Sequence, residues 1–425
     1  MKTDKRLKRL FASVIGGSWG TEPGEGEIDA LCIRGTDFDA TRLRVDTSRA
    51  PTRGFTIDDI RARAAITGDL IIEKSGGGEQ QPVGRAVLWD GTERVMPTNF
   101  AARLRVNVET DSRFATYLLA SMWSDGRTRA AIKQTTGIQN LDLTALLDQR
   151  VSCPSLPRQR AVADYLDRET ARIDALIAAK RRMVRLLEER WETFGIASVT
   201  SINAWSEHAR SGPDWLESVP REWSVERLKF LARMESGHTP DRKVDAYWVD
   251  CTIPWITLND VGTLQRDWAI DQSINAINDL GMANSAAHIL PAGTVVLSRD
   301  ATVGRAAILG RPMTISQHFV GWICGPRLMP EYLLHVLRGP MQRLFATLTA
   351  GATIATIGMP ELNDLVVPVP PVDEQRRIVA TLRSAQDRFD QARTALDMQV
   401  GLLLERRQAL VIAAVTGRLD IPEAA

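Results

Sequence analysis

Two carboxylates and a lysine in the first part of the chain come closest to a catalytic spacing. Asp69, Glu73 and Lys74 stand close together, and such carboxylates can hold Mg²⁺ in a nuclease site. The chain has 52 acidic residues, so one match of this kind is expected by chance. We therefore interpret these carboxylates as structural or solvated groups.

Other catalytic motifs are missing from the sequence. It has no G-x-x-x-x-G-K-[ST] loop for ATP, no G-x-G-x-x-G after a strand, and no Asn-Pro-Pro-aromatic tetrapeptide of amino-methyltransferases. The five histidines lack metal-ligand spacing, and the four cysteines form no C-x-x-C pair. The sequence therefore predicts a chain that is not an enzyme and binds no metal or cofactor itself.

Polar residues in turns beside apolar strands are the better candidates for binding. Arginine, lysine, asparagine and glutamine can make bidentate contacts with base edges or hold phosphates. The candidate DNA-facing residues are Arg34, Thr36, Lys74, Arg85 and Asn99 in the first half, and Lys243, Asn259, Arg299, Arg305, Gln317 and His318 in the second. The alternative for each is an ordinary solvated turn residue.

The elements that would position these turns occur twice. The segments that begin at Pro154 and Pro370 align without a gap, so that Gln159 falls on Gln375. Upstream of each, a strand, a polar turn, Val-Gly-Arg-Ala and a second strand recur at Gly84 and Gly304, which we interpret as turn glycines. The duplication predicts two similar globular heads, suited to two similar ligands or two half-sites.

Each repeat ends in a segment with coiled-coil periodicity. The second copy has an unbroken heptad seam, and in the first copy Lys180 interrupts the seam. The seam residues are Leu382, Phe389, Leu396, Leu403 and Leu410 in the second copy, and Leu166, Ile173, Leu187 and Phe194 in the first. Such a helix needs a partner. Either the two copies pair antiparallel within the chain, or a homodimer forms through the same seam.

The predicted fold class is α+β, with two β-rich mixed domains joined by two long antiparallel coiled-coil helices in an internal two-fold duplication. Short apolar runs punctuated by glycine and proline predict the strands of both heads. The predicted boundaries are 1–155 for the first head, 156–200 for the central helix, 201–212 for a linker, 213–370 for the second head and 371–421 for the C-terminal helix.

Composition adds two limits. The net charge of +1 argues against a protein that coats DNA through charge alone, although local basic patches remain open. No apolar stretch is long enough to span a membrane, and scattered cysteines are typical of a reducing cytoplasm. We therefore expect a cytoplasmic protein without a membrane partner.

The chain resembles the specificity subunits of type I restriction-modification systems. The strongest matches are LPRQRAVADYLDRETARIDALIAAKRRMVRLLEER and VPVPPVDEQRRIVATL, with DWLESVPREWSVERLKFLA and ALVIAAVTGRLD in support. The first copy departs from the family pattern, because LPRQR replaces Pro-Pro-x-x-Glu-Gln-Arg. The first head also lacks the Trp-x-x-x-x-Leu opening, so it matches the family pattern less well than the second head does.

The resemblance implies two target-recognition domains, each reading one half of an interrupted double-stranded DNA sequence. The helices would set the gap and dock two methyltransferase subunits, which use S-adenosylmethionine, while restriction and translocase subunits would use ATP and Mg²⁺. This phage-defence role would leave the chain itself non-catalytic. The alternatives are a methylation-only or type IIB recognition subunit, a coiled-coil adaptor without DNA specificity, and an enzyme with an unrecognised site.

Overall fold

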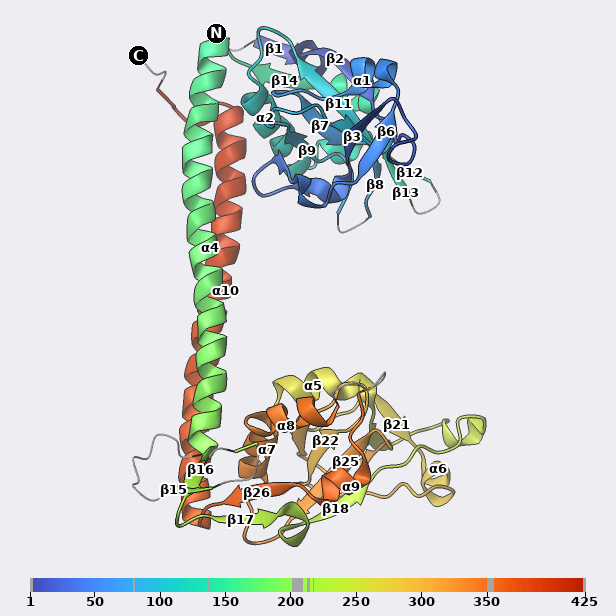
Figure 1. Ribbon diagram of the computed structural model, residues 1–425, viewed down its shortest axis with the longest axis vertical. Helices are drawn as coiled ribbons and strands as arrows, with labels where there is room; N and C mark the ends of the chain where they lie inside the picture. The colour runs from blue at the N-terminus through green and yellow to red at the C-terminus, as the bar shows by residue number, and fades with distance from the viewer. Residues whose placement is uncertain are drawn as a thin grey trace. The chain divides into compact units, whose positions relative to one another are not determined.

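The computed structural model describes residues 3–78, 81–135, 138–200, 209–211, 215–216, 218–349 and 355–422. The chain divides into two compact units, Met1–Arg182 with Leu396–Ala425, and Met183–Ala395. Each unit holds one head together with one end of each long helix (Figure 1). No helix in the described ranges is long and apolar enough to cross a membrane.

The first head is built on a mixed six-stranded sheet. Its strands in order are β2 (Phe11–Gly16), β11 (Ala101–Val106), β7 (Leu70–Glu73), β9 (Ala86–Leu88), β5 (Arg44–Val45) and β4 (Phe38–Asp39). The smaller sheets are β10 (Met96–Pro97) with β3 (Ile28–Ile33) and β6 (Thr52–Phe55), β12 (Ile132–Thr135) with β13 (Ile138–Leu141) and β8 (Ser75–Gly76), and β1 (Thr3–Arg6) with β14 (Arg150–Cys153). The helices are α1 (Ile57–Arg63), α2 (Ser112–Ser124) and α3 (Leu143–Leu147).

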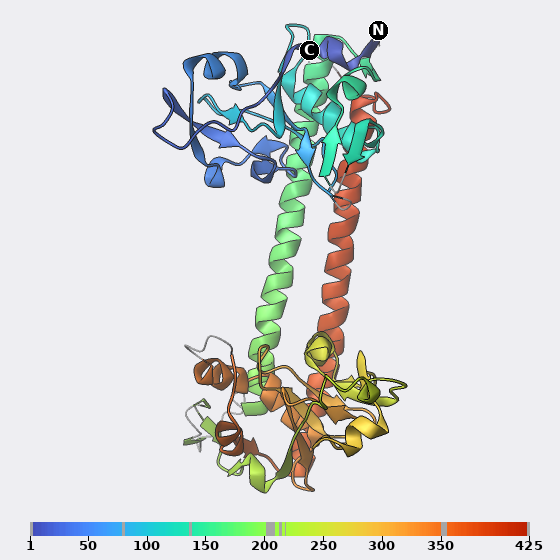
Figure 2. The ribbon, with the colours of Figure 1, turned by 90° about the vertical axis from the view of Figure 1, so that its right-hand side faces the viewer.

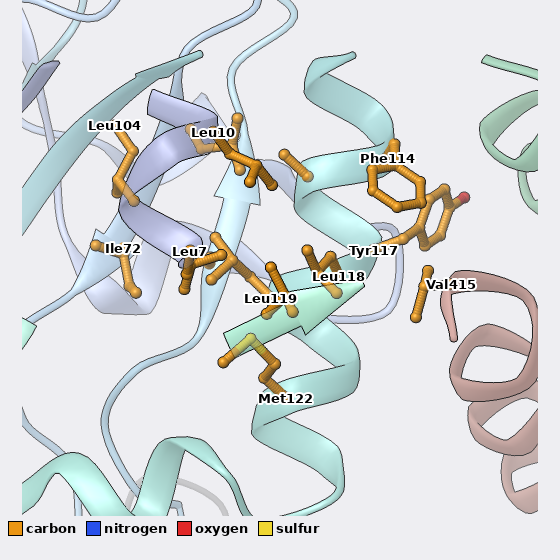
Figure 3. Close-up of a cluster of buried hydrophobic side chains, with 14 of the residues drawn as sticks. Leu7, Leu10, Ile72, Leu104, Phe114, Tyr117, Leu118, Leu119, Met122 and Val415 are labelled. Atoms are coloured by element: carbon orange, nitrogen blue, oxygen red, sulfur yellow. The ribbon is translucent and has the colours of Figure 1, made fainter. Parts of the chain in front are cut away.

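The core of this head lies between the large sheet and α2. Leu118, Leu119 and Met122 of α2 are buried, and they pack with Leu7 and Leu10 of the short 3₁₀ helix that follows β1 (Figure 3). Phe114 and Tyr117 point to the other side of α2, toward Val415 near the end of the C-terminal helix (Figure 3). The head and the helix ends of its unit therefore share one hydrophobic core.

The second head has a five-stranded sheet of the same kind. Its strands in order are β18 (Ala232–Ser236), β25 (Phe319–Cys324), β22 (Val295–Ser298), β23 (Ala306–Leu309) and β20 (Ala269–Ile270). The smaller sheets are β21 (Asn275–Ile277) with β19 (Ile253–Ile256) and β24 (Thr314–Ile315), β17 (Ser224–Arg227) with β26 (Val366–Val369), and β15 (Ala209–Ser211) with β16 (Ser218–Pro220). The helices are α5 (Val261–Arg266), α6 (Asp279–Ala283), α7 (Pro330–Arg338), α8 (Met341–Leu348) and α9 (Met359–Asn363). Most of the predicted linker, 201–208 and 212, lies outside the described residues.

The two heads repeat the same strand pairings. The central order β2-β11-β7-β9 recurs as β18-β25-β22-β23, and the parallel pair β3 and β10 recurs as β19 and β24. In the first head β1 leads directly into a 3₁₀ helix, as β17 does in the second, although no tryptophan stands at β1. The predicted duplication and fold class are confirmed, including for the head whose sequence was the weaker match.

The long helices are α4 (Leu156–Thr200) and α10 (Val372–Val415), and they run side by side in each unit (Figures 1 and 2). In the first unit Arg407 contacts Asp174 at 2.9 Å, and the Lys180 amine donates to Gln399 Oε1 at 2.5 Å. In the second unit Trp191 stacks on Phe389, with ring centroids 5.5 Å apart. Residue numbers rise along α4 as they fall along α10, so the helices are antiparallel. Of the two arrangements predicted, the chain adopts the intramolecular one.

A buried glutamine fixes the first turn of each long helix to its own head. Gln159, 1% exposed, donates to the Glu109 and Pro154 carbonyls and accepts from the Asp111 N–H. Gln375, 0% exposed, donates to the carbonyls of Arg327 and Pro370 and accepts from the N–H of Met329. The departure from the family pattern in the first copy therefore leaves this attachment intact.

Candidate nucleic-acid interfaces

In each head a parallel pair of strands brings two polar loops to one edge. Pro97 of β10 pairs with Ile33 of β3, and both strands end at this point. The loops that follow carry Thr36 and Asn99, and both side chains are exposed. The carboxyl ends of parallel strands meet at the same sheet edge, so residues far apart in sequence become neighbours. We call this region of the first head the recognition edge.

Backbone hydrogen bonds hold the recognition edge in place. The Thr98 N–H donates to the Ile33 carbonyl at 3.0 Å, and the Ser18 N–H donates to the Pro97 carbonyl at 2.9 Å. The N–H of Lys74, just after β7, donates to the Phe100 carbonyl at 2.7 Å. These bonds join the ends of four strands around the turn that carries Asn99.

The second head has a recognition edge with the same three bonds. Ile315 of β24 pairs with Ile256 of β19, and the following loops expose Asn259 and Gln317. The corresponding donor–acceptor pairs are Ser316 N–H to Ile256 O at 2.9 Å, His238 N–H to Ile315 O at 3.1 Å and Arg299 N–H to His318 O at 2.9 Å. The structure therefore makes Asn259 the counterpart of Thr36, Arg299 of Lys74, and Gln317 of Asn99.

A glycine permits the close backbone approach in both edges. A Cβ atom on Gly17 would lie 2.0 Å from the Pro97 carbonyl oxygen, and one on Gly237 would lie 2.2 Å from the Ser316 carbonyl oxygen. Real Cβ atoms do not come so close, so any other residue would push the turn away. The glycine thus helps to set the position of the exposed amide.

Arg34 is engaged inside the first edge and stabilises its loop. Its guanidinium donates to both carboxylate oxygens of buried Asp37, at 3.0 and 2.9 Å, and to the Arg49 carbonyl at 2.6 Å. The hydrogen bond to Asp37 raises the pKa of Arg34. In the second edge Thr257 and Asp260 form the matching capping box. Arg34 therefore helps to position the loop that carries Thr36, and the guanidinium of Arg34 is already bonded to Asp37 and to the Arg49 carbonyl.

Arg85 and Arg305 lie one strand away from these loops. The Arg85 carbonyl accepts from the Glu73 N–H, as the Arg305 carbonyl accepts from the Ser298 N–H. The half-buried Arg85 guanidinium pairs with Glu73 at 3.2 Å. The half-buried Arg305 side chain has no ion pair within the described residues. The two arginines are equivalent in position, but among the described residues a carboxylate neutralises Arg85 and none pairs with Arg305.

The other basic candidates differ in how far they are engaged. Arg299 donates through Nε to the Ile357 carbonyl at 3.1 Å, and His318 contacts Asp300 at 3.0 Å. The Lys74 amine has no ion pair in the described part of the chain. Lys243 is exposed in the loop before β19, where its N–H donates to Asp241, and no described contact joins it to the recognition edge.

Phe100 is a surface residue that the sequence reasoning missed. It follows Asn99, its side chain is 54% exposed, and its position corresponds to that of His318. The apolar pattern that begins at this residue predicted a strand and hid the exposure. The sequence signal that could have indicated its exposure is that Phe100 aligns with His318, a candidate residue, in the second repeat.

The two carboxylates of that spacing, Asp69 and Glu73, are each paired with an arginine. Asp69 is 2% exposed and accepts two hydrogen bonds from Arg105, at 2.9 and 2.6 Å. Glu73 is paired with Arg85. In the described ranges no group of three or more histidine, cysteine or acidic side chains could hold a metal ion. Both carboxylates therefore neutralise arginines within the head.

Comparison with known proteins gives both a domain match and a fold match. Residues 220–397 match the family model of the type I restriction modification DNA specificity domain. The chain is 26% identical over 188 residues to the type I restriction enzyme MjaIX specificity subunit of Methanocaldococcus jannaschii, covering 44% of this chain and 43% of that relative. It is 26% identical over 193 residues to the EcoR124I/EcoR124II specificity subunit of Escherichia coli, covering 44% and 45%. The matched part thus spans less than half the length of these curated relatives.

Two solved structures extend the likeness to almost the whole chain. A chain from a structure of the type I R-M system, described in terms of complex assembly and conformational transition, matches with a TM-score of 0.69 at 18% identity, covering 98% of both chains. The HsdS subunit from Thermoanaerobacter tengcongensis matches with a TM-score of 0.55 at 17% identity, covering 98% of this chain and 97% of that one. The chain therefore carries a type I restriction modification DNA specificity domain at residues 220–397 and shares its fold with these two structures.

Proposed function

We propose that this chain reads a bipartite DNA site, with one recognition edge for each half. The observation that carries the proposal is the repeated edge, in which the same backbone bonds present different side chains. Lys74 and Asn99 in the first head are replaced by Arg299 and Gln317 in the second. Cations can hold phosphates and amides can contact base edges, so each edge carries one group that can position it on DNA and one that can read a base.

The proposal assigns no chemical step to this chain. Two methyltransferase subunits would dock on the long helices and use S-adenosylmethionine, and restriction subunits would use ATP and Mg²⁺. The complex would act on DNA in the cytoplasm. The full-length fold match to a chain of a type I R-M system supports this division of labour.

Methylome sequencing of the host, with and without this gene, tests the proposal. We expect one interrupted motif to be methylated in the parent strain and unmethylated in the deletion strain. Restoring the gene on a plasmid should restore the motif. An unchanged methylome would contradict the proposal and favour an adaptor without DNA specificity, while loss of an uninterrupted motif would contradict the assignment of one half-site to each head.

A further inference from the structure

An amide side chain occupies the same position of the recognition edge in both heads. Asn99 and Gln317 are each the second residue after the end of a parallel strand, β10 in one head and β24 in the other. Each is followed by a residue whose carbonyl accepts from the N–H of a basic residue, Lys74 or Arg299. The backbone hydrogen bonds on both sides of the amide are thus the same in the two heads, although the residue that follows the amide is phenylalanine in the first head and histidine in the second.

The amides retain polar atoms for a ligand, whereas several neighbouring groups are engaged. His318 is paired with Asp300, and Arg299 donates through Nε to the Ile357 carbonyl and through Nη1 to the Gln317 carbonyl. In the described residues the Nη2 group of Arg299 makes no such bond, so it can still contact a phosphate. Both amide side chains are exposed. Asn99 makes no side-chain hydrogen bond within the described ranges. The Gln317 side-chain oxygen accepts from the Thr239 hydroxyl with one of its two lone pairs, which leaves its second lone pair and its NH₂ group unpaired there.

An amide at such a position selects one base. It offers a donor and an acceptor side by side, which matches N7 and the N6 amino group of adenine in the major groove. The other bases do not present this pair to an amide in the same geometry. Phe100, beside Asn99, adds an exposed apolar surface of the kind that packs on a thymine methyl group.

We propose that Asn99 and Gln317 each read one adenine, Asn99 in the first half-site and Gln317 in the second. Lys74 and Arg299 contact the adjoining phosphates and set the register of the edge on the duplex. This inference rests on the proposed function and adds to it a base and a residue for each half. The two half-sites then share an A·T pair at equivalent positions, whatever their other bases.

The test uses the full chain, co-expressed with the methyltransferase subunits of its host and purified as the complex. The variants are Asn99→Ala, Gln317→Ala, Asn99→Asp and Gln317→Glu, with Asn284→Ala as a control for loss of an exposed amide at a site outside the edge. Each complex is equilibrated with DNA pools in which one position of the motif at a time is randomised, and bound DNA is sequenced. Because the readout is a ratio between bases, a weaker binder still gives a result.

We expect each alanine variant to lose discrimination by about 5- to 150-fold at a single A·T position, in its own half only. The carboxylate variants should shift preference there from adenine toward cytosine, because a carboxylate accepts from the cytosine amino group. The control should keep the parent motif. Relaxation at a G·C position, in the other half, in both halves or nowhere would overturn the inference. A parent complex that selects no two-part motif would instead overturn the proposed function.

Discussion

Replacing Gln375 by methionine should destabilise the second unit strongly, because this glutamine joins the first turn of α10 to its head. The substitution keeps the approximate size of the side chain and removes three hydrogen bonds, to the Arg327 carbonyl, the Pro370 carbonyl and the Met329 N–H. The Pro370 carbonyl, which is buried, costs about 1–3 kcal/mol when it is left without a partner. Each of the two bonds in the half-buried surroundings of Arg327 and Met329 contributes about 0.5–1.5 kcal/mol. We therefore expect a loss of about 3 kcal/mol.

Calorimetry of the full chain measures this loss as a shift in the unfolding temperature. For a unit of about 200 residues, 3 kcal/mol corresponds to about 6–12 °C. Because the chain has two units, hydrogen exchange in peptides from α7 and β26 should confirm that the second unit is the one that opens. The control is Gln391→Met, which makes the same change at an exposed position of the same helix. If the two variants unfold within about 1 °C of each other, Gln375 does not attach the helix to the head as argued.

Three further predictions test the heads and their buried groups. Exchanging residues 213–370 for the corresponding head of a relative should change one half of the methylated motif; a change in both halves would refute separate reading. Burial lowers the pKa of His335 from 6.5 to about 3. Between these two pH values His335 is therefore protonated in the unfolded chain and neutral in the folded chain. Stability should therefore be lost as pH falls below 6.5, by up to about 1.4 kcal/mol per unit down to pH 3, and a matched denaturation series on His335→Phe should show a shallower slope. Burial raises the pKa of Cys32 to about 11, so iodoacetamide at pH 8 should label it in urea and spare it in the folded chain, as peptide mass spectrometry can determine.

The duplicated architecture could be predicted from the sequence because the patterns that indicate it lie within short segments and occur twice. The heptad seam ending at Leu410 and the match of Gln159 with Gln375 needed only one alignment of the chain with itself. The partners of that glutamine were not accessible, because the Glu109 and Arg327 carbonyls come from turns far from the helix in sequence.

Residue type alone identified candidate DNA-binding residues at the edge, but it could not show which of their side chains are already paired within the head. Arg34 and Arg85 have the right chemistry for DNA, yet both are held by carboxylates of their own head. The Glu73–Arg85 pair depends on strands β7 and β9 lying side by side, which polarity cannot indicate. Phe100 was missed for the opposite reason, since an apolar residue at the start of a strand is normally expected to be buried.

On the proposed function, one fold can serve two different half-sites because the backbone that holds each edge is independent of the side chains that the edge exposes. The bonds that hold the edge run between backbone atoms, and they survive the replacement of Asn99 by Gln317 and of Phe100 by His318 at equivalent points. The amides at these tips project into solvent, so exchanging one for another alters no core packing and has little effect on stability. Buried contacts at Gln159 and Gln375 meanwhile keep each head in a defined position on its helix. On the proposed function, a change of specificity therefore needs only substitutions at exposed positions of the edge, whereas substitution of Gly17 or Gly237 would move the whole turn.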